Sequence, residues 1–459
     1  MSVEFNKEYE LGDFVYFANE KINAEKVSQE KYISTENMVL DRGGVEKASK
    51  LPSVLKFNSF QKTDTLFSNI RTYFRKVWMA SFDGGASADV LVFRTKDENV
   101  LDPAYLYYLI SNKDFSDYSV LTAKGVKMPR GDKTAMMQYK FLLPDPEKQL
   151  KYALILKSID HKIENNRRMN ETLEGMAQAI FKSWFVDFDP VHAKVESFKN
   201  SGSEEDARIA AMCAISGKTA DALAQLKSEN PDDYAQLAST ADAFPSTFTD
   251  SPLGQIPKGW EVKNISDFGK VICGKTPSKS NKEYYGSDVP FIKIPDMHSN
   301  VFATQTTDSL SAKGAQSQKN KFVPKGSICV SCIATVGKVV IASQESQTNQ
   351  QINSIIPDKA EYSYFLFFAM KSLEKVFHDL ASGGSATLNM NTSTFSKVQL
   401  IKPEENILEI YHSCIEESMY KILQNDLENQ SLAETRDALL PKLLSGEIDV
   451  SALSNMEDL

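Results

Sequence analysis

The sequence predicts an α+β protein in which two β-rich modules are separated by a pair of long antiparallel coiled-coil helices, with a pseudo-twofold internal repeat. A shift of 259 residues places 144–185 on 403–444. Each of these copies follows a long stretch of β-prone segments broken by Gly, Asn, Asp and Ser. The identities between the copies are Pro144/Pro403, Tyr152/Tyr411, Lys162/Lys421, Ile163/Ile422, Asn166/Asn425, Asn170/Asn429, Leu173/Leu432 and Ala179/Ala438.

The two β-rich modules are expected at 1–143 and 260–402. They open with similar segments, YELGDF and WEVKNISDF. The apolar run at 66–80 resembles the run at 328–342, because a Lys-Val pair followed by apolar residues occurs in both. This repetition indicates that the modules share one plan.

The second half of each module repeats as well. A short apolar helix is expected around 105–110 in one and 364–370 in the other. Each module then closes with a loop rich in small and polar residues, at 123–134 and 381–394, followed by a strand that ends in proline.

Polar and basic side chains of the modules are candidates for contact with DNA. The loop 123–134 spaces its cations about three residues apart, which suits an exposed basic strip that meets phosphates. Amide and hydroxyl side chains can hydrogen-bond base edges or phosphates. For each candidate alone, an exposed surface or turn residue is the alternative. The candidates are Arg71, Tyr73, Arg75, Lys76, Lys124, Lys127, Arg130, Lys133, Lys275, Lys279, Lys282, Tyr284, Lys293, Asn349, Gln350, Gln351, Ser385, Asn389 and Asn391.

Two long helices are expected at 144–190 and 403–446, each introduced by a proline. In both segments, residues spaced alternately three and four positions apart form an unbroken heptad seam. A helix of about 40 residues is roughly 60 Å long. Both seams are polar at the same central places, so we expect the helices to pair antiparallel with Asn meeting Asn. The alternative is that each seam packs on its own module or on another subunit. The expected pairing residues are Ile159, Ile163, Asn166, Asn170, Leu173, Ile422, Asn425, Asn429 and Leu432.

The second seam is less apolar than the first, because Ser418 and Arg436 weaken it. Between the first helix and the second module, 191–259 is expected to be a partly helical connector. Helices are indicated at 204–215 and 219–229 with Gly217 between them, after a flexible start at 196–206. The chain ends in an acidic tail at 447–459.

The net charge of −9 is unevenly distributed. The two modules carry +1 and +5, from 20 basic against 19 acidic residues and from 16 against 11. The segment 144–259 carries −5 and the segment 403–459 carries −10. The acid therefore lies on the helices and tail, and the modules are neutral to basic. Five cysteines and no apolar run of membrane length favour a cytoplasmic protein.

The sequence argues against catalysis by this chain. Residues 269–276 (GKVICGKT) match the phosphate-loop pattern, but Pro277 follows where the pattern needs a helix. Cys329 and Cys332 lack a second pair of metal ligands, so core cysteines are expected and no metal site is predicted. No nucleophile–base set is recognisable.

Three segments resemble a known family, the specificity subunits of type I restriction–modification systems. Residues 160–190 (DHKIENNRRMNETLEGMAQAIFKSWFVDFDP) resemble its central conserved region, and 244–262 (FPSTFTDSPLGQIPKGWEV) resemble the entry into its second target-recognition domain. Residues 432–450 (LAETRDALLPKLLSGEIDV) are similar to its C-terminal conserved region. The order of domains covers nearly the whole chain.

The resemblance implies that the modules are target-recognition domains, each reading one half of an interrupted double-stranded DNA sequence, and that the helices set the gap. It implies a non-catalytic cytoplasmic chain without its own cofactor. Two methyltransferase subunits using S-adenosylmethionine, and restriction subunits using ATP and Mg²⁺, are the implied partners. The acidic helices and tail are then partner-binding faces.

Two other functions remain open from the residues alone. One is a coiled-coil scaffold whose β modules bind protein, which predicts no preference among DNA sequences. The other is a single-chain restriction or methylation enzyme, which the absence of recognisable cofactor and nuclease motifs disfavours.

Overall fold

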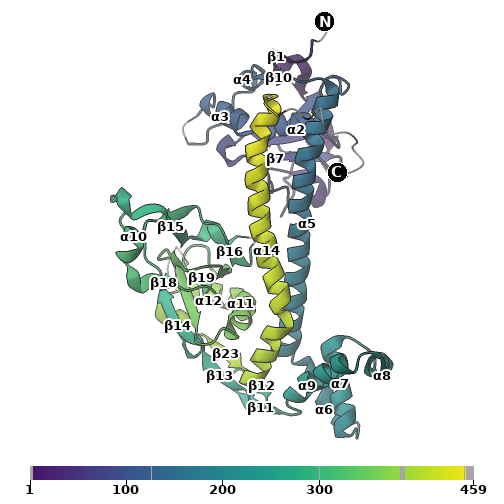
Figure 1. The fold of residues 1–459 in the computed structure, drawn as a ribbon, viewed down its shortest axis with the longest axis vertical. Helices are drawn as coiled ribbons and strands as arrows, with labels where there is room; N and C mark the ends of the chain where they lie inside the picture. The colour runs from purple at the N-terminus through teal and green to yellow at the C-terminus, as the bar shows by residue number, and fades with distance from the viewer. Residues whose placement is uncertain (1–3, 126, 299, 383–387, 449, 451–459) are drawn as a thin grey trace. The chain divides into compact units, whose positions relative to one another are not determined.

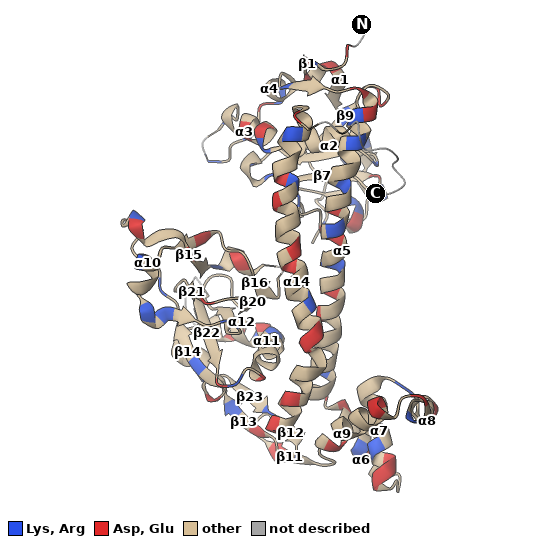
Figure 2. Cartoon of the chain, viewed as in Figure 1, with Lys and Arg blue, Asp and Glu red and all other residues tan. Residues whose placement is uncertain are grey.

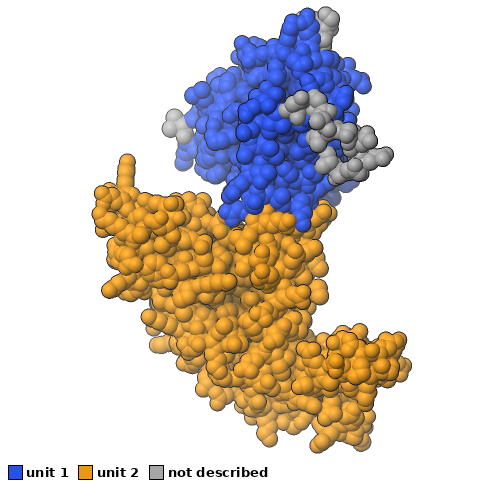
Figure 3. All heavy atoms as spheres, in the orientation of Figure 1, with its two compact units in different colours: residues 1–164, 429–459 blue, residues 165–428 orange. Residues whose placement is uncertain are grey.

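The computed structural model describes residues 4–125, 127–298, 300–382, 388–448 and 450 (Figure 1). The chain divides into two compact units (Figure 3). Unit 1 comprises Met1–Glu164 and Asn429–Leu459, and unit 2 comprises Asn165–Glu428. Two helices of 40 residues, α5 (Pro146–Phe185) and α14 (Glu405–Leu444), each contribute a segment to both units. No helix of the described ranges has the length and apolar character needed to cross a lipid bilayer.

Unit 1 contains three small sheets. Strand β1 (Lys7–Glu10) pairs antiparallel with β10 (Lys140–Leu143), so the start of the module meets its end. A second sheet is antiparallel in the order β2 (Val15–Phe17), β9 (Val90–Thr95), β6 (Thr65–Ser68) and β7 (Val77–Met79). The third has the order β3 (Lys21–Asn23), β5 (Lys56–Phe60), β8 (Gly84–Ala86) and β4 (Tyr32–Ile33), with β4 and β8 parallel.

Apart from the segments of α5 and α14, the helical elements of unit 1 lie between its strands. The helix expected around 105–110 is α2, which begins at Pro103 because Asp102 accepts hydrogen bonds from the N–H groups of Ala104 and Tyr105. The helical elements are α1 (Leu11–Phe14), η1 (Ala24–Lys26), η2 (Gln29–Lys31), η3 (Thr72–Phe74), α2 (Pro103–Ser111), α3 (Lys113–Leu121) and α4 (Lys133–Met137).

Unit 2 contains the hairpin β11 (Phe248–Ser251) and β12 (Gly254–Pro257), and the antiparallel pair β13 (Glu261–Asn264) and β23 (Gln399–Lys402). A five-stranded sheet has the order β14 (Gly269–Cys273), β22 (Ile352–Pro357), β19 (Ile328–Ser331), β20 (Val339–Ala342) and β16 (Phe302–Ala303). A four-stranded sheet has the order β17 (Asp308–Leu310), β15 (Tyr285–Ile292), β21 (Ser346–Thr348) and β18 (Phe322–Val323).

The pairings of unit 1 recur in unit 2. The ladder β1–β10 has its counterpart in β13–β23, and the hairpin β6–β7 in β19–β20. The two apolar runs that resemble each other in sequence form these hairpins. The helical elements of unit 2 before α14, apart from the segment of α5, are α6 (Asp189–Lys199), α7 (Glu204–Ser216), α8 (Ala220–Glu229), α9 (Pro231–Ala243), η4 (Ile265–Asp267), η5 (Lys282–Tyr284), η6 (Ile294–Met297), α10 (Ala312–Gln316), η7 (Lys319–Lys321), α11 (Tyr362–Ser372), α12 (Glu374–Ala381) and α13 (Thr392–Ser396).

The connector is more helical than the sequence indicated. The helices expected at 204–215 and 219–229 are present, with Gly217 in the left-handed conformation after α7. Of the predicted flexible start at 196–206, residues 196–199 belong to α6, and 204–206 belong to α7, which begins under the cap of Ser203. Of the predicted acidic tail, only residues 447, 448 and 450 are among the described residues.

The expected seams of the long helices are covered from solvent. All twenty seam positions, ten on each helix, are buried or half-buried. Within unit 2, Asn425 Nδ2 donates to Asn170 Oδ1 at 2.8 Å, and Tyr411 donates to the carbonyl of Ala177 at 3.3 Å. Within unit 1, Arg436 pairs with Asp160. In unit 2 the residue numbers rise on one helix as they fall on the other, so the paired segments there are antiparallel.

The modules pack on these helix segments by different means. In unit 2, Phe181 and Phe185 of α5 contact Phe365 of α11 and Tyr411 of α14, with ring centroids 5.0 to 6.3 Å apart. In unit 1, the fully buried Gln149 of α5 donates to the carbonyls of Val100 and Pro144 and accepts from the N–H of Asp102. An aromatic cluster thus anchors one module, and hydrogen bonds and ion pairs contribute to anchoring the other.

Candidate nucleic-acid interface

Two loops of unit 1 lie side by side and carry most of its predicted contact residues. The first, 69–76, connects β6 and β7; the second is 123–134. Lys124 and Arg130 exchange two backbone hydrogen bonds of 2.8 and 2.9 Å, which close the tip of the second loop. The backbone N–H of Arg71 donates to the carbonyl of Pro129 at 2.9 Å, which joins the two loops. Arg71 therefore lies beside the predicted cationic strip, and both loops form one surface.

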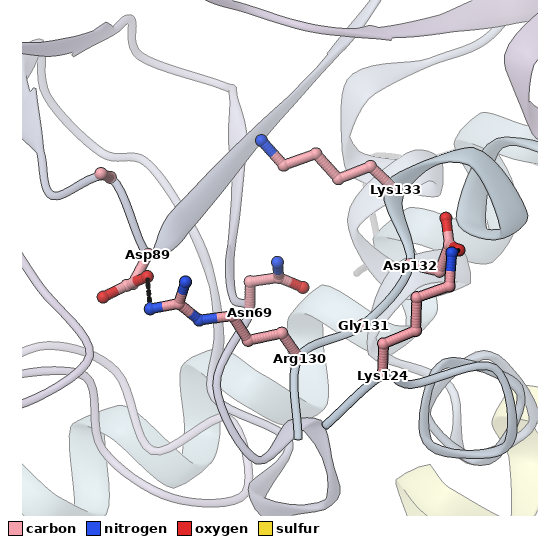
Figure 4. Close-up of a pocket in the computed structure, with 8 residues that line it drawn as sticks. Asn69, Asp89, Lys124, Arg130, Gly131, Asp132 and Lys133 are labelled. Atoms are coloured by element: carbon pink, nitrogen blue, oxygen red, sulfur yellow. Dashed lines mark ion pairs between the residues drawn. The ribbon is translucent and has the colours of Figure 1, made fainter. Parts of the chain in front are cut away.

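A pocket of about 350 Å³ lies on this surface (Figure 4). Its floor includes Asn69, which is 7% exposed and whose Oδ1 has no hydrogen-bond partner within the described ranges. Gly131 keeps the pocket open, because a Cβ there would lie 2.1 Å from Met136 Cε and 3.0 Å from Asn69 Oδ1. The lining residues are Asn69, Ala88, Asp89, Lys124, Arg130, Gly131, Asp132 and Lys133.

The pocket combines cations with carboxylates. Arg130 pairs with Asp89 at 2.8 Å, as the dashed line in Figure 4 marks, and Lys124 pairs with Asp132. The hydrogen bond from Lys124, helped by the N–H groups at the start of α4, holds the pKa of Asp132 below its ordinary value. A carboxylate accepts from the amino group of cytosine, and an Asn amide pairs with adenine. The rim therefore suits phosphates and the floor suits base edges.

The sequence reasoning named the cations of this pocket but missed Asn69, Asp89 and Asp132. Asp132 was detectable, because it stands directly before a short helix and accepts from Thr134 N–H at 2.9 Å as an N-cap. Asn69 and Asp89 lie 20 residues apart, and only the pairing of β6 with β9 brings them together.

Unit 2 repeats this arrangement with uncharged side chains. The N–H of Cys332 donates to the carbonyl of Gln351 at 2.8 Å, as that of Asn69 donates to Asp89 at 2.8 Å. The N–H of Ala334 donates to the carbonyl of Leu388 at 2.9 Å, as that of Arg71 donates to Pro129, and Asn391 caps α13 as Asp132 caps α4. Gln351 and Asn391 are therefore brought together by the same backbone contacts as their counterparts.

In unit 2, a second set of loops, which carries Lys275, Thr276 and residues 348–351, adjoins the loops just described. Lys275 N–H donates to the carbonyl of Thr348 at 2.9 Å, and Thr276 donates to Gln350 Oε1 at 2.5 Å. The Asn349 amide donates to Gln351 Oε1 at 3.0 Å. The segment that matches the phosphate-loop pattern lies here, and the next helical element is the short turn η5, so no helix N-terminus faces a phosphate after Thr276.

The remaining predicted residues divide into exposed and engaged ones. Arg75 is half-buried against Asp41 and Asp437, Lys76 donates to the carbonyl of Thr35 at 2.7 Å, and Lys293 pairs with Asp308 at 2.7 Å. These three are half-buried as well as engaged, whereas Lys124 and Arg130 are paired but exposed, so we leave the three out of the proposed interface. Ser385 lies outside the described residues. Exposed or half-exposed are Arg71, Tyr73, Lys127, Lys279, Lys282, Tyr284 and Asn389.

The two core thiols, Cys329 and Cys332, give no sign of reactivity. Burial raises the pKa of Cys329 to about 11 and that of Cys332 to about 12, so both are neutral thiols at physiological pH. They belong to different apolar clusters of unit 2. Across the described ranges no group of His, Cys, Asp or Glu is arranged to hold a metal ion.

Comparison with known proteins assigns the chain to a family. The model for the type I restriction modification DNA specificity domain matches 4–175 and again 257–436. The HindI type I restriction enzyme specificity subunit of Haemophilus influenzae is 44% identical over 460 residues, covering 96% of this chain and 99% of the relative. The MjaIX specificity subunit of Methanocaldococcus jannaschii is 26% identical, covering 76% and 70%.

A solved structure agrees on the fold. The S subunit of a type I restriction–modification system from M. genitalium superposes with a TM-score of 0.50 at 14% identity, covering 97% of this chain and 96% of that one. The chain therefore belongs to the family of type I restriction modification DNA specificity domains, and it is a specificity subunit of a type I restriction–modification system that carries two such domains.

Proposed function

We propose that this chain reads a double-stranded DNA target in two parts, with one half-site for each β-rich module. The observation that carries the proposal is the repeated loop arrangement. Each specificity domain places a hairpin loop, a second loop and a short capped helix together through the same backbone hydrogen bonds. The side chains on these loops differ, with cations and carboxylates in unit 1 and amides in unit 2. Two similar frames with different side chains suit two different half-sites.

The contacts of the first half-site are proposed to come from the pocket and its rim. Arg71, Lys124, Lys127, Arg130 and Lys133 would meet phosphates, since Arg and Lys supply most backbone contacts to DNA. Asn69 and Asp89 at the pocket would meet base edges. For the second half-site the corresponding groups are Lys275, Gln350, Gln351, Asn389 and Asn391.

The helices α5 and α14 are proposed to set the gap between the half-sites. Each runs for 40 residues and contributes to both units, so the length of the pair would be fixed by the fold. Acidic residues recur along α14 (Figure 2), which makes the α14 side of the helix pair unsuited to contact DNA directly. Its exposed faces would bind two methyltransferase subunits, and restriction subunits would join that complex. S-adenosylmethionine, ATP and Mg²⁺ would be held by those partners.

The deciding experiment maps methylated adenines in the genome of cells that carry this chain with its neighbouring methyltransferase. The expected result is one new motif in two parts, separated by a fixed unspecified gap. An assembled complex that produces no new motif would overturn the proposal and favour a scaffold with protein-binding modules. Methyl transfer by the purified chain alone would favour an enzyme instead.

A further inference from the structure

Four non-glycine residues of unit 1 adopt the left-handed backbone conformation on two loops that backbone hydrogen bonds join. They are Asp41, Arg42, Arg71 and Arg75, with φ values of 49°, 61°, 51° and 49°. The first two lie on one loop and the last two flank η3 on the hairpin loop 69–76. Asp41 N–H donates to the carbonyl of Phe74 and Arg42 N–H to that of Arg75. Such conformations are strained and persist only where the surroundings enforce them.

The surroundings here converge on one carboxylate of α14. Asp437 pairs with Arg42, lies 3.7 Å from Arg75, and lies 3.2 Å from Arg436 on its own helix. The Arg42 side chain is 2% exposed, and within the described part of the chain its Nε and Nη1 make no hydrogen bond. Burial opposes ionisation of Asp437, but the neighbouring guanidinium groups of Arg42 and Arg436 outweigh it and lower the pKa of this carboxyl. Asp437 is therefore an anion that neutralises buried cations from both loops.

The matching loop of unit 2 also contains a non-glycine residue in this conformation, Ala334 at φ 64°, but it differs at the position of Arg75. Counting back from the Lys-Val pair that opens β7 and β20, Arg75 stands where the second module has Gly337. Both residues are left-handed, at 49° and 90°, but glycine adopts this conformation without steric cost. The charged pair beside it, Lys338 and Glu374, is 3.3 Å apart with both side chains 40% exposed or more, and Glu374 lies on the module's own α12. Within the described residues, the hairpin loop of the first module carries an ion pair to a long helix, whereas the charged pair of the second module's loop stays within that module.

We infer that Asp437 is a positioning residue for reading of the first half-site. By pairing with Arg42 and Arg75, Asp437 fixes the position of the hairpin loop 69–76. The hydrogen bond from Arg71 to Pro129 then fixes the cationic loop 123–134 relative to the hairpin loop. Asp437 acts from the helix and touches no DNA. This inference rests on the proposed function and adds a determinant of specificity that lies outside the proposed contact residues.

The test uses the complex of the full chain with its methyltransferase, and DNA duplexes with substitutions in either half-site. Asp437→Asn keeps the shape and removes the charge. We expect discrimination at the first half-site to fall on the order of tenfold, because the misplaced loop weakens a few base contacts worth about 1–3 kcal/mol each. Discrimination at the second half-site should stay unchanged. The salt dependence of binding should also stay unchanged, because no phosphate contact is removed.

Substitutions at Arg75 provide an independent arm. Arg75→Gly should keep discrimination, because glycine adopts the conformation freely, whereas Arg75→Ala should lose it, because alanine is strained there and lacks the anchor. The control Glu374→Gln removes the pair of the second module and should leave the first half-site unaffected. Melting curves establish that each variant is folded.

The inference is overturned by unchanged discrimination at the first half-site in folded Asp437→Asn, or by equal behaviour of Gly and Ala at position 75. An equal loss at both half-sites also overturns it, since that indicates general destabilisation. If the wild-type complex itself reads no bipartite sequence, the proposed function fails instead, so the two failures are distinguishable.

Discussion

Replacing Asp426 with Asn should stabilise unit 2 at neutral pH. Asp426 lies on α14, where burial raises its pKa from 3.8 to about 6. Asn170 donates to its Oδ1 at 2.8 Å and Arg167 favours the anion, but Glu174 opposes it. Its Oδ2 is buried and has no hydrogen-bond partner within the described ranges. The carboxylate is therefore ionised at neutral pH in a place that disfavours its charge.

The magnitude follows from the two pKa values. A difference between about 6 and 3.8 corresponds to a cost of about 3 kcal/mol for the ionised form. The folded chain holds this proton more tightly than the unfolded chain, so stability rises as the pH falls through 6. The cost is fully present above the folded pKa and vanishes below the unfolded one. An Asn side chain can still accept the hydrogen bond from Asn170, so the variant avoids the cost at every pH.

The assay is a comparison of melting temperatures at pH 8 and pH 4.5. Asp426→Asn should melt several degrees above the wild type at pH 8, since about 1 kcal/mol corresponds to about 2–4 °C in a unit of this size. The difference should shrink at pH 4.5. Glu417→Gln, an exposed carboxyl on the same helix, is the matched control and should change little. The reasoning would be refuted if the variant melted above the wild type by the same amount at both pH values, or if it melted below the wild type at pH 8.

Other perturbations test the interface and the helices. Reversal of Lys124, Lys127, Arg130 and Lys133 to Glu should abolish binding through the first half-site, measured with half-site duplexes. Normal affinity with a normal salt slope would count against the loop. Deleting one heptad from both α5 and α14 should change the gap in the methylated motif, and an unchanged gap would contradict their role as spacer. Leu at both Asn170 and Asn425, in the Asp426→Asn background, should raise the melting temperature but loosen helix register, as disulfide cross-linking would reveal. Phe185→Ala should destabilise unit 2 by about 3–5 kcal/mol in urea, whereas the exposed neighbour in Val186→Ala should cost little; equal effects would refute the aromatic anchor.

The sequence predicts the parts of this fold that depend on local patterns. The long helices, the two short apolar helices, and the helices on either side of Gly217 follow from heptads, apolar runs and a glycine stop. The heptad alone does not predict which residue of one helix lies opposite which residue of the other. Asn425 meets Asn170, while Asn166 donates to Glu428 at 2.8 Å. A seam fixes which face is buried, and the loops and modules decide which residue lies opposite which.

The polar contacts of unit 1 could not be predicted from the sequence for a related reason. Arg436 was interpreted as a weakness of its seam, but it pairs with Asp160, which also accepts a hydrogen bond from Tyr108 at 2.8 Å. Partners 276 residues apart leave no periodic signal. The same holds for Asn69 and Asp89 at the pocket. Buried charged residues become interpretable only when the fold supplies their partners.

The repeat diverges where each module contacts the helices. With the shift of 259, Asp160 corresponds to Met419 and Arg436 to Ala177. Met419 and Ala177 are buried among apolar residues of unit 2, whereas their counterparts in unit 1 form an ion pair. An apolar module face placed against Asp160 and Arg436 would strip water from both charges, at several kcal/mol for each ion left without compensating contacts. The helix faces are therefore not interchangeable, although the two modules share one plan. An internally repeated chain needs this difference, because matching faces would let either module pack against either segment of the helix pair.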